Sequence, residues 1–154
     1  KDITIVSFSE SLLQVMRINN LLKKYSVNAE IIDLRSLRPL DEKTIIKSVK
    51  KTRNLIVVDN GWTKYGISSE IISLISEKAF KFLKSAPVKI GIKNVSIASS
   101  RELAKFSYLD SKTILISILN VLNKKINIKN INKDVKILQQ FETDIPYKDF
   151  NGPF

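Results

Sequence analysis

The chain has 154 residues, no cysteine and no histidine, and its 26 lysines and arginines against 15 acids give a formal net charge of +11. A chain of this composition, acting alone, has no imidazole base, no Ser-His or Cys-His pair and no zinc site built on these two residue types. Its length favours one domain, and no apolar run approaches the ~20 residues of a membrane-spanning helix.

The first part of the sequence predicts a strand, a helix and a second strand. Residues 3–8 and 29–34 are short apolar runs rich in β-branched side chains, which is typical of buried strands. Ser11 and Gln14 form a capping-box pair for the helix between them. The residues expected on the buried face of this helix are Leu12, Leu13, Met16, Leu21 and Leu22.

Two further helices and a third strand are predicted next. Pro39 ends the second strand region because it lacks a backbone N–H, and Asp41 predicts the N-cap of a helix that runs through Val49. Residues 55–58 predict the third strand. The helical pattern resumes after Gly66.

The remaining elements complete an alternating order. Residues 87–92 predict a fourth strand, residues 95–98 a fifth strand at the sheet edge, and Asp110 the N-cap of a last helix. We therefore expect a three-layer α/β/α fold with a mostly parallel five-stranded sheet. We expect an α/β domain over residues 1–122 and a C-terminal extension over residues 123–154, packed on the surface or on a partner.

Acidic residues at strand ends are the first candidates for chemistry, because open α/β sheets bind ligands outside the carboxyl ends of their strands. Asp33 and Asp59 stand at such ends. We favour a structural role for both, as the cap of a turn or the partner of Arg35, Arg38 or Arg53. No glycine-rich phosphate-binding fingerprint follows the first strand, which argues against a self-contained nucleotide site.

Two segments are more specific than a generic α/β domain requires, namely residues 32–41 (IDLRSLRPLD) and residues 57–71 (VVDNGWTKYGISSEI). Together with the opening residues 2–9 (DITIVSFS), they resemble the C-terminal domain of the transketolase superfamily. The resemblance is strongest to the E1 beta subunit of 2-oxo acid dehydrogenases of the pyruvate type. It covers about residues 2–122, with Asp59-Asn60 in place of the family's acidic pair.

The resemblance implies that this chain performs no catalysis. In that superfamily thiamine diphosphate and its Mg²⁺ are bound by the other two domains, so we expect no catalytic, cofactor-binding or metal-binding residue here. The implied role is subunit assembly, in a homo- or hetero-oligomer with other E1 or transketolase domains, and docking to an E2 core. A basic E2 docking module would need an acidic surface, which the charge of +11 opposes.

The residues that could serve an interface lie in the two motifs. Arg35 and Arg38 offer guanidinium forks suited to a carboxylate across an interface. Trp62 and Tyr65 could anchor a partner or fill the edge of the domain's own core. The full set of interface candidates is Arg35, Arg38, Asp59, Gly61, Trp62, Tyr65 and Gly66.

Two alternatives stay open. One is a stand-alone interaction module that uses the loop around Trp62 and the extension. The other is a basic domain that binds anions or nucleic acid, although scattered lysines and few arginines are more typical of a solvated surface. The absence of cysteine and of a signal-peptide pattern favours the cytoplasm or an organelle matrix over secretion, without membrane attachment. The strand at the very start suggests a piece of a longer polypeptide.

Overall fold

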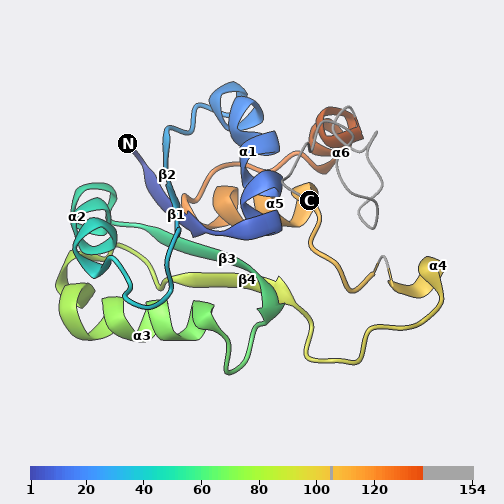
Figure 1. The fold of residues 1–154 in the computed structure, drawn as a ribbon. Coiled ribbons are helices and arrows are strands. Elements are labelled where there is room, and N and C mark those ends of the chain that lie inside the picture. The colour runs from blue at the N-terminus through green and yellow to red at the C-terminus, as the bar shows by residue number, and fades with distance from the viewer. Residues whose placement is uncertain (105, 137–154) are drawn as a thin grey trace.

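The computed structural model describes residues 1–104 and 106–136 (Figure 1). Strands and helices alternate along most of this length, as the sequence predicts. The elements are β1 (Ile3–Ser7), α1 (Ser9–Lys24), β2 (Ala29–Asp33), α2 (Glu42–Thr52), β3 (Leu55–Trp62), α3 (Ile67–Ala79), the 3₁₀ turn η1 (Phe80–Phe82), β4 (Val88–Ile92), α4 (Arg101–Ala104), α5 (Ser111–Val121) and α6 (Ile128–Lys136).

The sheet has four strands in the order β2-β1-β3-β4, and every pairing is parallel. Helices α2 and α3 cover one face, and α1 and α5 cover the other, so the predicted three-layer α/β/α fold is confirmed (Figure 1). The predicted fifth strand is wrong, because residues 95–98 pair with no strand of the described chain. A tight turn, in which the N–H of Val95 donates to the carbonyl of Lys93 at 2.7 Å, ends the extended geometry just after β4.

Each strand of the sheet centre supplies side chains to two cores, because successive residues of a strand point to opposite faces. This double coverage explains why β1 and the first part of β3 read as continuous apolar runs. The core under α1 and α5 contains Ile3, Ile5, Ile56 and Val58, whereas the core under α2 and α3 contains Val6, Leu55 and Val57.

Helix α1 is rotated relative to the prediction. Leu13 and Met16 are 42% and 51% exposed, so their expected burial is wrong. The capping box also fails: Ser11 is buried and its hydroxyl donates to the carbonyl of Phe8 at 2.6 Å. The helix starts at Ser9, which turns Ser11 toward the sheet instead of the helix end. Its buried residues are Ser11, Gln14, Val15, Ile18 and Leu22.

The N-caps predicted for α2 and α5 are confirmed. The carboxylate of Asp41 accepts from the N–H of Thr44 at 3.1 Å, and that of Asp110 accepts from the N–H of Thr113. The Thr44 side chain and N–H hydrogen bonds hold the pKa of Asp41 below its ordinary value. These carboxylates satisfy N–H groups that a helix start would otherwise leave unpaired.

Helix α6 packs on the domain and shares its core, since Ile131 and Val135 are buried in the cluster under α1 and α5. The boundary at residue 122 stays a prediction, and residues 137–154 of the extension lie outside the described residues. None of the helices in the described part has the length and apolar character that crossing a membrane requires.

Candidate functional site

The carboxyl end of the sheet has a topological switch point between β1 and β3, from which the chain winds in opposite directions. Open α/β sheets usually bind ligands in the crevice at this point. Here two buried hydroxyls lie at the crevice: that of Ser7 donates to the carbonyl of Val58 at 2.9 Å, and that of Ser11 lies 2.9 Å from the Ser7 hydroxyl and 3.2 Å from the same carbonyl oxygen. Local side chains thus occupy the usual ligand position.

A further pair of contacts bridges the same crevice. Asn60, near the end of β3, donates its side-chain N–H to one carboxylate oxygen of Glu10 on α1. Gln14 donates to the other oxygen at 2.9 Å. Both oxygens of the Glu10 carboxylate therefore accept hydrogen bonds from neighbouring amides.

The two strand-end aspartates have the structural roles that the sequence favoured. Asp33 forms an ion pair with the Nε of Arg35. Asp59 is only 4% exposed, and its carboxylate accepts from the N–H of Gly61 at 2.8 Å. The carboxylates at this end of the sheet are thus engaged by their own neighbours. This arrangement does not fit a Mg²⁺–diphosphate group, and no cluster of three or more potential acidic, histidine or cysteine ligands occurs among residues 1–104 and 106–136.

The loop after Asp59, residues 61–66, is named here the Trp62 loop. Its two aromatic side chains point outward: Trp62 is 57% exposed and Tyr65 is 99% exposed. Gly66 is required at the end of the loop, because a Cβ there would lie 2.7 Å from the carbonyl oxygen of Trp62. Both side chains are thus too exposed to fill the core edge, and partner anchoring stays a prediction for them.

Hydrogen bonds hold the Trp62 loop against its neighbours. The N–H of Thr63 donates to the carbonyl of Ile92 at 3.3 Å, and the N–H of Lys64 donates to the side-chain oxygen of Asn94 at 3.2 Å. The amide of Asn94 in turn donates to the hydroxyl of Thr63 at 3.1 Å. A shallow depression of about 510 Å³ lies beside the loop, lined by Tyr65, Gly66, Ile67, Ser69, Glu70 and Ser73.

The structure brings together five of the seven interface candidates and leaves two apart. Asp59 and the Trp62 loop form one group, whereas Arg35 and Arg38 lie exposed after β2. Strand β1 separates β2 from β3 in the sheet, so the two groups share the same end of the sheet but lie on different parts of it.

Sequence reasoning missed two other sets of exposed apolar side chains. Leu13 and Met16 lie on the outer side of α1, and their exposure could not be read from helical spacing alone. The second set lies in the connection between β4 and α5, where a strand was expected. Its members are Val95, Ile97, Leu103, Phe106 and Tyr108.

The start of α3 holds one buried polar group that makes no hydrogen bond to the described residues. Ser68 is 1% exposed, and its hydroxyl has no hydrogen-bond partner in the described part of the chain. A buried hydroxyl without a partner destabilises a fold.

Comparisons with known proteins agree with this fold. The family model described as "Transketolase, C-terminal domain" matches residues 1–114. The beta subunit of the mitochondrial pyruvate dehydrogenase E1 component from Chaetomium thermophilum is 40% identical over 109 residues, which is 70% of this chain and 28% of that protein. The same subunit from Saccharomyces cerevisiae is 36% identical over 124 residues, 79% of this chain and 34% of the relative.

A third relative, the corresponding subunit from Dictyostelium discoideum, is 44% identical over 89 residues, 58% of this chain and 25% of that protein. The chain therefore spans about a quarter to a third of these relatives. Among solved structures, a chain titled "Split gene transketolase, inactive beta4 tetramer" has the same fold, with a TM-score of 0.68 and 21% identity over 82% of this chain and 41% of that one. The family match over most of the chain shows that it belongs to the transketolase C-terminal domain family.

Proposed function

We propose that the chain is a non-catalytic C-terminal domain of a thiamine-diphosphate-dependent enzyme, of the pyruvate dehydrogenase E1 beta or transketolase type, and that it serves subunit assembly. The relatives are E1 beta subunits, and about two thirds or more of their length lies outside the match. That remainder is where the family resemblance puts thiamine diphosphate and Mg²⁺. The chain would supply a docking surface to a reaction centre built by other domains.

One observation carries the proposal: hydrogen bonds hold the Trp62 loop in place, yet more than half of each of its aromatic residues is exposed. Trp62 and Tyr65 are 57% and 99% exposed, while hydrogen bonds from Thr63 and Lys64 tie the loop to the end of β4. Tryptophan and tyrosine are enriched among the residues that contribute most to binding energy. A preformed loop also lowers the entropy that binding must overcome.

The partner we propose is an oligomer of E1 or transketolase subunits. Self-assembly is supported by the fold neighbour, whose title describes a tetramer of beta chains. An E2 core as second partner stays a prediction, and a strongly basic docking module would meet unfavourable charge on this chain. We place the parent enzyme in the cytoplasm or an organelle matrix, in keeping with relatives that are named mitochondrial.

The test compares Trp62→Ala with Phe80→Ala in the full chain. Phe80 is 70% exposed on η1, outside the Trp62 loop, so it controls for the loss of an exposed aromatic ring. Trp62→Ala should weaken association in sedimentation equilibrium roughly tenfold or more while the melting temperature changes little. Phe80→Ala should leave association unchanged.

A second measurement addresses catalysis directly. Titration of the chain with thiamine diphosphate and Mg²⁺ should show no saturable binding in calorimetry, because the switch-point crevice and its carboxylates are already occupied by local contacts. Tight binding of thiamine diphosphate by a single copy would contradict the proposed function, as would equal association of the two variants.

A further inference from the structure

The carboxylate of Asp59 is a buried charge without a cationic partner in the described chain. Asp59 is 4% exposed, and the hydrogen bond that its Oδ1 accepts from the N–H of Gly61 at 2.8 Å is the only one that its side chain makes within residues 1–104 and 106–136. No ion pair within the same ranges includes Asp59. Buried charges in proteins are paired with an opposite charge or coordinate a metal ion. The charge of Asp59 therefore needs compensation from outside the described side chains.

Two glycines border this carboxylate. A Cβ on Gly61 would lie 3.2 Å from Oδ2 of Asp59. Outside Gly66 and its chain neighbours, the three heavy atoms nearest to the position of a Cβ on Gly66 are all oxygens. They are the carbonyl oxygen of Trp62 at 2.7 Å, Oδ2 of Asp59 at 3.4 Å and Oγ of Ser68 at 3.9 Å. A carboxylate, a carbonyl and a hydroxyl thus lie within 3.9 Å of one point, and such oxygens are the ligands that hard cations prefer.

The Ser68 hydroxyl is an independent indication of a bound ligand. Ser68 is 1% exposed, and its Oγ has no hydrogen-bond partner among the described residues. In native structures such an atom indicates a strained site, a catalytic role or a bound water or ion. Because this oxygen lies on the same side of Gly66 as the Asp59 carboxylate, one ion would satisfy the hydroxyl and neutralise the carboxylate together.

The charged groups nearby do not neutralise Asp59. The ammonium group of Lys89 donates to the exposed hydroxyl of Ser69 at 2.8 Å, and the side chain of Lys64 is exposed. Glu70, in the first turn of α3, adds a negative charge. The N-terminus of α3 carries a partial positive charge equivalent to about half a unit. However, the one hydrogen bond to the Asp59 carboxylate within the described chain comes from Gly61 rather than from α3, so part of the negative charge remains.

We propose that a monovalent alkali cation, Na⁺ or K⁺, binds between the carboxylate of Asp59, the carbonyl of Trp62 and the hydroxyl of Ser68. One carboxylate balances one positive charge, and the described residues contain no group of three or more acidic, histidine or cysteine side chains that would suit a divalent ion. The ion would join the end of β3, the Trp62 loop and the start of α3, which lie together at the carboxyl end of the sheet (Figure 1).

This site goes beyond the proposed function and does not depend on it. The resemblance to the transketolase superfamily assigns Mg²⁺ to other domains and implies no metal-binding residue in this one. Here the ion would have a structural effect: it would hold the backbone of the Trp62 loop at a fixed position relative to α3. The loop and its single tryptophan should therefore respond to the cation.

The experiment measures the fluorescence of Trp62, the one tryptophan of the chain, and the melting temperature of the full chain. NaCl or KCl replaces tetramethylammonium chloride in steps, so that the ionic strength and the chloride concentration stay constant. The fluorescence should change saturably with Na⁺ or K⁺. The melting temperature should rise by about 3–6 °C once the cation exceeds its Kd about tenfold.

Asp59→Asn keeps the shape of the side chain, removes its charge and should abolish both responses. The matched control is Asp33→Asn at the end of β2, which should respond as the wild type because Asp33 already pairs with Arg35. Ser68→Ala tests the site with the carboxylate intact. It should raise the Kd of the cation about tenfold. In tetramethylammonium chloride alone it should be more stable than the wild type, because there the hydroxyl has no partner.

The outcomes are distinct. Identical behaviour of the wild type in alkali and tetramethylammonium salts would overturn the cation and leave a buried water as the ligand of Ser68. Unchanged cation affinity in both Asp59→Asn and Ser68→Ala would overturn the position of the site, and a response to CaCl₂ alone would overturn the monovalent ion. None of these results changes the association expected for Trp62→Ala, so the proposed function stands or fails separately.

Discussion

The two ends of the sheet differ in the side chains that they expose. At the amino end, where the strands begin, charged and polar groups are paired with one another. At the carboxyl end the strand-end carboxylates are also ion-paired or hydrogen-bonded, whereas the buried hydroxyl of Ser68 is not in the described chain. Aromatic and apolar side chains are exposed there on the Trp62 loop and on the connection between β4 and α5. The contacts of the first end stabilise the fold, and the second end presents exposed apolar surface of the kind that the proposed docking role requires.

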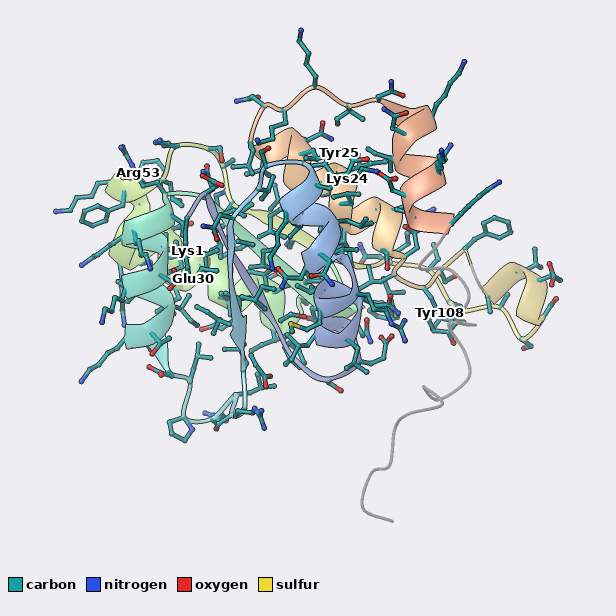
Figure 2. All side chains as sticks on the ribbon, turned by 90° about the horizontal axis from the view of Figure 1, so that it is seen from above. Lys1, Lys24, Tyr25, Glu30, Arg53 and Tyr108 are labelled. Atoms are coloured by element: carbon teal, nitrogen blue, oxygen red, sulfur yellow. The ribbon has the colours of Figure 1, made fainter. Side chains whose placement is uncertain are left out.

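At the amino end, lysine side chains contact a carboxylate and backbone carbonyl groups. Lys51 and Lys1 contact Glu30 at 2.8 Å and 3.3 Å, and these hydrogen bonds, with that of Lys51 first, lower the pKa of Glu30 (Figure 2). Lys124 donates to the carbonyls of Tyr25 and Ser26 at 3.1 Å and 2.8 Å, where α1 ends. Cations there meet the partial negative charge of helix C-termini.

The same argument limits what the basic charge can do. A polar depression of about 310 Å³ at this end is lined by Lys1, Lys51, Arg53 and Lys84 among others. Lys1 and Lys51 contact Glu30, and Arg53 donates its Nε–H to the carbonyl of Phe82 at 3.3 Å, so three of these cations already have a structural use. The alternative of a basic anion-binding or nucleic-acid-binding domain therefore gains no support from this cluster of charges.

The largest expected loss of stability comes from the close approach of the β3 and β4 backbones at the carboxyl end. A Cβ at Gly91 would lie 2.6 Å from the carbonyl oxygen of Gly61, so Gly91→Ala must push β4 away from β3. We expect a loss of about 2–3 kcal/mol in the free energy of unfolding by urea. Lys93→Ala, just past the strand, is the control and should cost little; equal stability of the two variants would contradict the close approach.

The second prediction concerns the amino end. Asp134 is buried on α6, and its carboxylate accepts from Lys24 at 2.6 Å and from the hydroxyl of Tyr25 at 2.9 Å (Figure 2). Asp134→Ala should lower the free energy of unfolding by about 1–3 kcal/mol, since it leaves the Tyr25 hydroxyl without its partner. Lys133→Ala on the same helix is the control. If Asp134→Ala weakened self-association without changing stability, the contrast between the two ends would fail.

The same contact predicts a pH dependence. The hydrogen bond from Lys24, followed by that from Tyr25, lowers the pKa of Asp134 below its ordinary 3.8. The contribution of Asp134 to the free energy of unfolding is thus complete above its ordinary pKa and is lost as pH falls through the lowered pKa. Burial, with the hydrogen bond to Asp134, raises the pKa of Tyr25 from 10.0 to about 12. The contribution of Tyr25 to the free energy of unfolding is therefore lost as pH rises through that range. Urea titrations of wild type and Asp134→Ala should converge at the acidic extreme; a constant difference at all pH values would exclude this linkage.

A smaller effect with the opposite sign is expected at Ser68. Because its buried hydroxyl has no partner, Ser68→Ala should raise the free energy of unfolding by about 1 kcal/mol. Ser73→Ala, at an exposed position of the same helix, should change it little. A loss of stability in Ser68→Ala would mean that the hydroxyl has a partner after all.

Much of the fold could be predicted because local chemistry decides it. Asp41 and Asp110 cap their helices as expected, since a carboxylate before a helix satisfies N–H groups whatever the tertiary context. The face of α1 could not be predicted, because Leu13 and Met16 have the spacing of core residues and only packing shows that Val15 and Ile18 are inside. Exposure of Trp62 and Tyr65 is likewise a tertiary property. The strand expected at residues 95–98 failed because β-branched residues favour a strand only where a sheet edge receives them.

Hydrogen–deuterium exchange at low and high protein concentration tests the contrast between the two ends most directly. Association through the Trp62 loop predicts that residues 61–66 gain protection as concentration rises, while residues 50–54 at the amino end do not change. Protection confined to residues 50–54, or no concentration dependence anywhere, would contradict the account.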